Sequence, residues 1–179
     1  MQTYVALLYS IILGEGRRLV MTDLKAMAEE LGLKKVRTLV ATGNLVFETP
    51  ATAVADLEQR LEAAFEKTFG RHVVIIVRTA EDWLKLAAGN PFPGESAEAG
   101  DQVAVRVMRK PAPVDAVAAL EAYAAADEKV MSVGGDIWVV FSRERPSSRL
   151  LAATSHKRLG IGTSRNWNTV RKLAEMVGA

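Results

Sequence analysis

The densest group of polar side chains in the 179-residue sequence lies near its C-terminus. Hydroxyl, guanidinium and amide groups follow one another there, in Thr163, Ser164, Arg165, Asn166, Trp167, Asn168 and Thr169. Apolar residues at helical spacing follow over 170–177, which predicts a helix with Asn166 or Asn168 as its N-cap. Free N–H groups at a helix N-terminus favour anions, and Arg165 adds a positive charge. We therefore expect an anion or phosphate site here, with Trp167 able to stack on a ring. Ordinary capping beside a core tryptophan is the alternative.

A turn with two glycines and two arginines lies between the first expected strand and the first expected helix. Gly14 and Gly16 occupy the first two positions of a dinucleotide-binding fingerprint, but Leu19 stands where the third glycine belongs. The fingerprint is therefore absent. Arg17 and Arg18 leave the turn able to grip an anion, although a plain strand-to-helix connection is the simpler interpretation.

The third candidate segment is the expected hairpin turn at Thr42, Gly43 and Asn44. Glycine and asparagine adopt positive φ at little cost, so the hairpin alone explains these residues. Thr38 stands four residues before Thr42 on the same strand face, where the two hydroxyls would share a polar surface. A binding role for this segment depends on its position alone.

Residues typical of catalysis or metal binding are few. The chain has no cysteine, which excludes disulfides, a cysteine nucleophile and cysteine-ligated zinc. His72 and His156 have no metal-ligand spacing, and no Gly-x-Ser-x-Gly elbow marks a serine nucleophile. Glu95, Glu98 and Asp101 fall in a loop of small residues and are predicted to be solvated. We expect no metal and no cofactor, and the sequence leaves open whether the protein is an enzyme.

The charge of the chain is unevenly distributed. Between Arg143 and Lys172, eight basic residues stand against one acid, Glu144, so this stretch carries +7 within a total of +2. Such a stretch suggests an anionic partner, a nucleic acid, a contact between subunits, or a plain solvated surface. Nucleic acid is the less expected partner, because the predicted strands lack the aromatic pattern of an RNA-recognition domain.

The N-terminal residues 4–13 are almost all apolar. No basic residue precedes this run, and ten residues are too few to cross a bilayer as a helix. We interpret it as a buried strand and expect a soluble, cytoplasmic protein without a membrane partner, either a monomer or a homodimer.

The hydrophobic pattern predicts the same order of elements twice. The first set comprises a strand at 4–12, a helix from Met21 to Leu31, a hairpin at 36–40 and 45–47, a helix at 53–69 and a strand at 73–77. A short helix at 81–88 precedes the second set, which comprises a strand at 102–108, a helix at 113–125, a hairpin at 130–133 and 137–141, a helix at 147–159, a short edge strand at 161–164 and a last helix at 166–177. Each set is the βαββαβ order of a ferredoxin-like unit. The prediction is an α+β protein with two ferredoxin-like halves and an extra C-terminal helix, divided into 1–79, a connection at 80–100, and 101–179.

Several of these segments in combination resemble a known bacterial family, number 1697 among the domains of unknown function. The likeness is carried by residues 4–8, the loop at Gly14, Met21 with Leu24, Leu31-Gly32, Val36-Arg37-Thr38, residues 42–47 and residues 163–170. The resemblance implies an α+β fold with duplicated ferredoxin-like halves and assigns no activity.

The sequence departs from the family at one place. Tyr9, Ser10 and Ile12 stand where the family usually has Arg, Gly and Asn. If those family residues form a polar site, this protein has lost part of it or binds something less anionic there.

The leading hypothesis from the sequence is a binding protein for an anionic or phosphate-bearing ligand. Its site would combine the turn from Gly14 to Arg18, the turn from Thr42 to Asn44 and the cap from Thr163 to Thr169. One alternative is an enzyme acting on a phosphorylated metabolite or nucleotide, with Arg17 and Arg165 acting electrostatically. Another is nucleic-acid binding through the basic C-terminal stretch.

Overall fold

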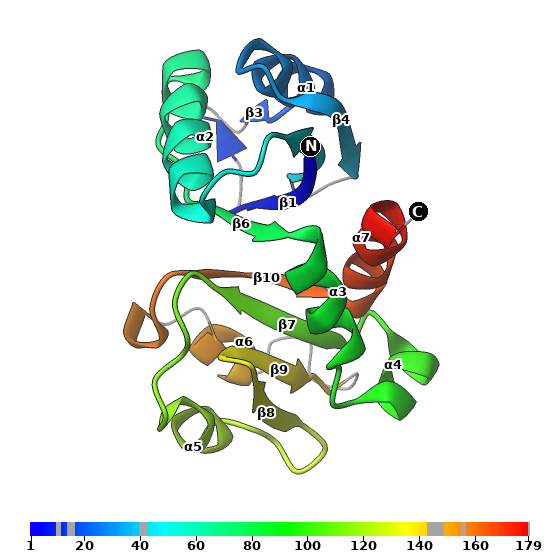
Figure 1. Ribbon diagram of the computed structural model, residues 1–179. Coiled ribbons are helices and arrows are strands. Elements are labelled where there is room, and N and C mark those ends of the chain that lie inside the picture. Colours follow the sequence, from blue (N-terminus) through cyan, green and yellow to red (C-terminus); the bar gives the residue numbers. More distant parts are fainter. Residues whose placement is uncertain (10–11, 14–16, 40–42, 143–148, 155–156, 179) are drawn as a thin grey trace. The chain divides into compact units, whose positions relative to one another are not determined.

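A computed structural model describes residues 1–179 except 10–11, 14–16, 40–42, 143–148, 155–156 and 179 (Figure 1). The chain divides into two compact units. The first comprises Met1–Lys85 and Leu173–Ala179, and the second comprises Leu86–Lys172. Each unit has a four-stranded antiparallel sheet of its own. The domain limits expected from the sequence, 1–79, 80–100 and 101–179, stay a prediction.

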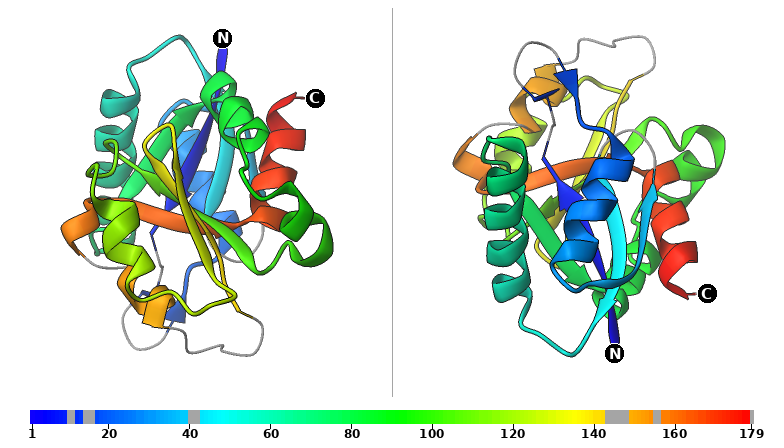
Figure 2. Two further views of the ribbon diagram at one scale, coloured as in Figure 1. Left: turned by 90° about the horizontal axis from the view of Figure 1, so that it is seen from below. Right: turned by 90° about the horizontal axis from the view of Figure 1, so that it is seen from above.

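The sheet of the first unit has the strand order β4-β5-β1-β6. Its elements are β1 (Gln2–Leu8), α1 (Met21–Glu30), β4 (Lys34–Leu39), β5 (Asn44–Thr49), α2 (Val54–Phe69) and β6 (Ile75–Thr79), with a two-residue pair β2 (Ile12–Leu13) and β3 (Arg17–Arg18) after β1 and α3 (Ala80–Ala88) at the end. Both α1 and α2 cover the same face of the sheet (Figure 2). This is the ferredoxin-like arrangement.

Alternation along β1 explains the core of the first unit. Tyr4, Ala6 and Leu8 are fully buried on the face that α1 and α2 cover. The Tyr4 ring stacks on Phe47 of β5, with 5.7 Å between ring centroids. Gly70 ends α2 in the left-handed region, at φ 72°, where a residue with a side chain would be strained.

Two carboxylates of α2 cover the outer edge of β6. Glu58 accepts a hydrogen bond from the N–H of Val77 at 3.0 Å, and Glu62 accepts one from the N–H of Ile75 at 3.1 Å. An edge strand otherwise presents unpaired N–H groups that invite pairing with another chain. The helix therefore closes one edge of this sheet with side chains rather than with a further strand.

The second unit repeats the same topology. Its sheet has the order β10-β7-β9-β8. The elements are α4 (Pro93–Ala99), β7 (Val103–Met108), α5 (Ala116–Glu121), β8 (Lys129–Val133), β9 (Asp136–Val140), α6 (Arg149–Thr154), the 3₁₀ turn η1 (Lys157–Leu159) and β10 (Gly162–Asn166). The last helix, α7 (Trp167–Gly178), begins in this unit, and its residues from Leu173 onward are counted with the first unit. Counted along the chain, the four strands lie in the spatial order second, third, first and fourth in both sheets. The predicted duplication of a ferredoxin-like half is therefore confirmed.

Several predicted elements differ from the structure in extent or type. The strand predicted at 4–12 forms over Gln2–Leu8, and the helix predicted at 147–159 forms as α6 over Arg149–Thr154 with the separate 3₁₀ turn η1. The helix predicted at 113–125 forms only over Ala116–Glu121, where Ala116 and Leu120 are its buried residues. The residues around Glu95 and Glu98, predicted as a loop, form the helix α4.

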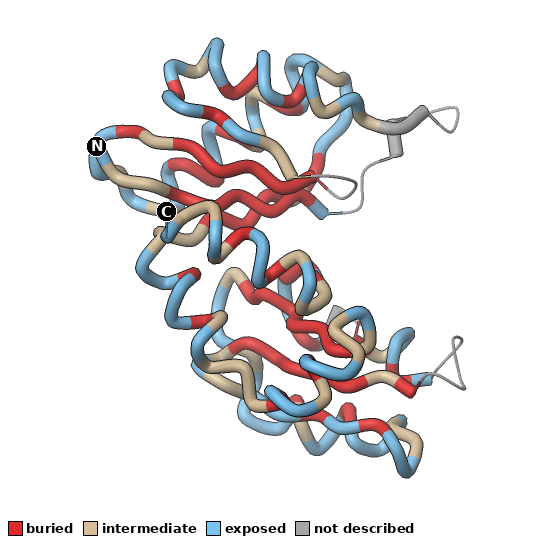
Figure 3. Tube along the Cα trace, turned by 90° about the vertical axis from the view of Figure 1, so that its right-hand side faces the viewer, coloured by how far each residue is buried: buried red, intermediate tan, exposed pale blue. Residues whose placement is uncertain are grey.

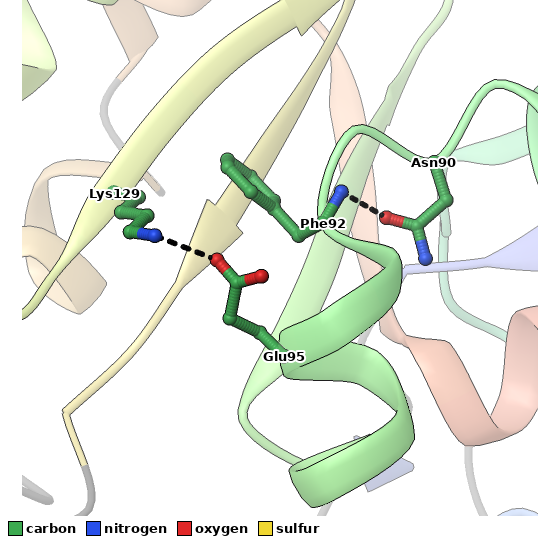
Figure 4. A network of polar contacts seen from close by, with 4 residues as sticks. All are labelled: Asn90, Phe92, Glu95 and Lys129. Carbon is green, nitrogen blue, oxygen red and sulfur yellow. Dashed lines mark hydrogen bonds and ion pairs between the residues drawn. The ribbon is translucent and has the colours of Figure 1, made fainter.

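Local hydrogen bonds explain why α4 forms (Figure 4). Asn90 accepts a hydrogen bond from the N–H of Phe92 at 2.9 Å, just before the helix begins at Pro93. Proline suits this first position because its missing N–H would have no partner there. Glu95 on α4 pairs with Lys129 of β8 at 2.9 Å, which ties the helix to the edge of the sheet.

Burial follows the strands of both sheets (Figure 3). In the second unit, apolar side chains of β7, β9, α5 and α6 form one cluster that includes Ala104, Met108, Leu120, Ile137 and Leu150. Among the described residues, no helix combines the length and the apolar composition that crossing a bilayer requires.

Candidate anion-binding site over strand β10

Strand β10 contains the first part of the polar segment singled out in the sequence. It pairs with β7 at the edge of the second sheet, with Ser164 opposite Arg106 and Asn166 opposite Ala104. Because side chains alternate along a strand, Ser164 and Asn166 share the helix-covered face of the sheet with Arg106. Thr163 and Arg165 lie on the other face. The polar segment is therefore divided between two faces.

Arg106 occupies an unusual place for a charged residue. Its neighbours on the same face of β7, Ala104 and Met108, belong to the apolar cluster, and Arg106 itself is only 6% exposed. Its Nη2 donates a hydrogen bond to the carbonyl oxygen of Gly160 at 3.1 Å. A buried guanidinium costs free energy unless hydrogen bonds compensate its lost hydration, so its position requires a specific polar environment.

Gly162 makes room for this arginine. A Cβ added at Gly162 would stand 3.1 Å from Nε of Arg106 and 2.8 Å from Sδ of Met108. Because position 162 has no side chain, the Arg106 side chain can lie close to the β10 backbone and reach the carbonyl oxygen of Gly160.

A cavity of about 170 Å³ lies beside Arg106, between α6 and the β10 side of the sheet. Its polar lining residues are Arg106, Thr154, Ser164, Arg165 and Asn166. Its apolar lining comes from β7, β9, Phe141 and α6, at Ala104, Ile137, Val139, Phe141 and Leu151. The site thus gathers side chains from three strands and one helix.

The polar groups around this cavity are mainly hydrogen-bond donors. Arg106 offers guanidinium N–H groups and Ser164 an exposed hydroxyl. Asn166 accepts the N–H of Thr169 through Oδ1 at 3.0 Å, which leaves its NH₂ group as the donor. Thr154 differs, because its hydroxyl already donates to the carbonyl of Leu151 at 2.7 Å. Among the described lining residues there is no acid, so the cavity suits an anion.

Arg165, the charged residue that the sequence favoured, has structural partners on the opposite face. Its Nη1 donates to Oγ1 of Thr163 at 2.9 Å and to the carbonyl oxygen of Ser164 at 2.8 Å. Burial disfavours its charged form and lowers its pKa to about 10, so the guanidinium keeps its charge at neutral pH. The structure therefore gives Arg165 a role in fixing the conformation of β10.

The remaining cap residues occupy distinct positions. Asn166 is the N-cap of α7, as one of the two sequence predictions had it. Trp167 is half-buried and packs at 6.2 Å, centroid to centroid, against the buried Trp138 of β9. The amide of Asn168 lies against Gly100, where an added Cβ would collide with Oδ1 of Asn168. These contacts within one unit hold the N-terminus of α7 against its sheet.

The other two sequence segments belong to the first unit. Gly14, Gly16 and Thr42 lie outside the described residues, and Arg17 is described only as part of the backbone of β3. Gly43 adopts the left-handed conformation expected of a turn, at φ 69°. The site combining these segments stays a prediction.

The two polar residues beside this turn do not share a sheet face. Thr38 pairs with Leu45 and therefore faces α1 and α2, whereas the fully buried Asn44 pairs with Leu39 on the opposite face. Asn44 donates from Nδ2 toward the carbonyl of Leu39 at 3.5 Å. The polar surface that Thr38 was expected to share with Thr42 stays a prediction.

The basic residues of the C-terminal stretch are partly exposed and partly buried. Arg149, Arg158, Arg171 and Lys172 are exposed, whereas Arg165 is 5% exposed and its charge is withdrawn from the surface. Arg143 and Arg145 lie outside the described residues, as does the side chain of Lys157. Nucleic-acid binding through this stretch stays a prediction. In the described part of the chain, no three His, Asp or Glu side chains group as a metal site requires.

Arg106 is the residue that sequence reasoning missed. A signal was present, since the strand sequence Val-Ala-Val-Arg-Val-Met places one arginine among apolar residues that are all buried. A charge at such a position is uncommon unless it is paired or functional.

The fold and the site together define a protein of two ferredoxin-like halves with a donor-lined cavity in the second half. The family model described as "Protein of unknown function (DUF1697)" matches residues 1–138, and the chain belongs to this family. A solved structure, "conserved bacterial protein SP0830 from Streptococcus pneumoniae", is similar at a TM-score of 0.76 and 24% sequence identity, over 98% of each chain. At this identity the likeness supports the fold alone. The search of curated proteins finds no match.

Proposed function

We propose that this protein binds a small oxyanion, a phosphate or carboxylate group, in the cavity over β10. The observation that carries the proposal is the buried Arg106 at a core-facing position of the central strand β7, where it lines a cavity together with the donors Ser164 and Asn166 on the same sheet face. A charged side chain at a core-facing position is uncommon, and this one lines the cavity beside the donors of Ser164 and Asn166.

The surroundings strengthen the attraction of Arg106 for an anion. Apolar side chains of β7, β9 and α6 line much of the cavity, and charges interact more strongly where water is excluded. A charge-assisted hydrogen bond from a guanidinium to an oxyanion is roughly twice as strong as one between neutral groups.

The volume sets the size of the ligand. One water molecule takes about 30 Å³ of liquid volume, so a cavity of about 170 Å³ holds a phosphate or carboxylate group with a few attached atoms. Ser164 is exposed, which gives the ligand a route of entry beside β10.

Isothermal titration calorimetry with inorganic phosphate tests the proposal. We expect the wild-type protein to bind phosphate and Arg106→Met to lose about tenfold or more in affinity, because a guanidinium hydrogen bond to an anion contributes about 1.5–3 kcal/mol. Arg171→Met removes the same charge from an exposed position on α7 and should bind phosphate as the wild type does.

A second variant tests the proposal in case Arg106→Met does not fold. Ser164→Ala changes an exposed residue, so the fold should persist while phosphate affinity falls by about threefold to tenfold with the loss of one donor. The proposal is overturned if the wild type does not bind phosphate, or if both variants bind it as tightly as the wild type.

A further inference from the structure

A second and larger cavity lies between α5 and α6. Its volume is about 380 Å³, and the described residues that line it are Ala119, Tyr123, Arg149, Ala152, Ala153 and Arg158. No lining residue is shared with the cavity over β10. The motif analysis of the sequence did not single out this place.

Its lining combines one aromatic ring with two cations. The guanidinium carbon of Arg149 lies 5.3 Å from the centroid of the Tyr123 ring. Tyr123 is 46% exposed as a residue, although a tyrosine ring would gain free energy from burial. Arg158, from the turn after α6, adds the second guanidinium.

The wall between these groups is formed by three small residues. Ala119 belongs to α5, while Ala152 and Ala153 belong to α6. Larger side chains at these facing positions would fill the space between the helices. The alanines thus leave an apolar surface beside the ring, open to solvent because Ala119 and Ala152 are exposed.

We propose that this cavity binds a planar aromatic molecule that carries an anionic group, such as an aromatic phosphate or carboxylate. The flat part packs against the alanines and the Tyr123 ring, where a planar guanidinium and a ring both offer stacking surfaces. The anionic group pairs with Arg149 and Arg158, whose forked N–H groups match a phosphate or carboxylate. No acid stands among the described lining residues to oppose it.

Phenyl phosphate is a suitable probe, because it joins a flat ring to a phosphate group. We expect titration with phenyl phosphate to shift the NMR signals of the Tyr123 ring, and cyclohexyl phosphate, with the same charge but no flat ring, to bind about threefold to tenfold more weakly. Equal affinity for the two compounds, or no shift at Tyr123, overturns the proposal.

Variants separate this site from the one over β10. The double variant Arg149→Gln/Arg158→Gln should lose about tenfold or more in phenyl phosphate affinity and retain its affinity for inorganic phosphate. Ala152→Leu adds bulk at an exposed helical position and should block phenyl phosphate without disturbing the fold. Wild-type binding by both of these variants, or a loss of phenyl phosphate binding in Arg106→Met alone, would show that the probe binds elsewhere.

Discussion

Arg165 donates a hydrogen bond from Nη1 to Oγ1 of Thr163 over 2.9 Å, along one face of the edge strand β10. Both residues are about 95% buried or more. A buried guanidinium remains stable only when acceptors replace its lost water. Thr163 therefore helps to stabilise the buried charge of Arg165, and this hydrogen bond supports the local conformation of β10.

The pair predicts a stability effect that can be measured by urea denaturation. Thr163→Val preserves the shape of the side chain and removes the acceptor, so we expect a loss of about 1–3 kcal/mol in the free energy of unfolding. Adding Arg165→Met removes the buried charge as well, and the double variant should regain most of that loss. A single variant as stable as the wild type would contradict this assignment.

Gly162 supports a second prediction, which connects stability with binding. Gly162→Ala places a Cβ 2.9 Å from the carbonyl oxygen of Val107 and 3.1 Å from Nε of Arg106. Overpacking of this kind costs about 1–3 kcal/mol, and it should also displace Arg106 and weaken phosphate binding. Thermal unfolding and calorimetry measure the two effects.

The matched control is Gly94→Ala on α4. A Cβ at Gly94 meets no atom within 4 Å, so this variant should unfold and bind phosphate as the wild type does. If Gly162→Ala has the same melting temperature and phosphate affinity as Gly94→Ala, the proposed close contact between Arg106 and β10 at Gly162 is wrong.

The fold was largely predictable because its signals are local. The alternation in β1, the apolar stripe of α2 and the Gly134-Gly135 turn between β8 and β9 each identify one element, and the order of elements then indicates a ferredoxin-like unit. The helix α4 was missed because Gly94 and its small neighbours suggest a loop, while the contacts that accompany the helix, the hydrogen bond from Phe92 to Asn90 and the ion pair of Glu95 with Lys129, cannot be read from the local pattern.

The candidate site was only partly predictable. The polar segment after Gly162 was recognised, but β10 continues to Asn166. Because side chains alternate along a strand, Arg165 and Asn166 lie on opposite faces of the sheet. The partner that completes the cavity, Arg106, lies 58 residues before Ser164 in the sequence and is placed opposite it only by strand pairing. Contacts of this kind depend on register, which a single sequence specifies weakly.

The contact between α2 and β6 predicts the effect of removing a buried acceptor. Glu58→Leu leaves the N–H of Val77 without this carboxylate at a buried place, and we expect a loss of about 1–3 kcal/mol in the free energy of unfolding. Glu58→Gln keeps an oxygen acceptor and should lose clearly less. Equal losses in the two variants would mean that the hydrogen bond to Val77 contributes little.

The ion pair between Glu95 and Lys129 predicts a dependence of stability on pH. The hydrogen bond from Lys129, together with a backbone hydrogen bond at Glu95 and the attraction of the Lys129 charge, lowers the pKa of Glu95 below its usual 4.5. A carboxyl group with a lowered pKa in the folded state stabilises the protein at pH values above 4.5, and that contribution disappears as the pH falls through the folded-state pKa.

Thermal unfolding of the wild type and of Glu95→Gln therefore should differ at pH 7 and converge below the lowered pKa. Lys129→Met removes the partner and should reduce the melting temperature at pH 7 to a similar extent. Since the pair is exposed, the effect should be small and should shrink at high salt. Combining the two substitutions should add nothing to either one, because the interaction is already lost in each. A melting-temperature difference that persists unchanged below the lowered pKa would assign the stabilisation to the packing of Glu95 instead of its charge.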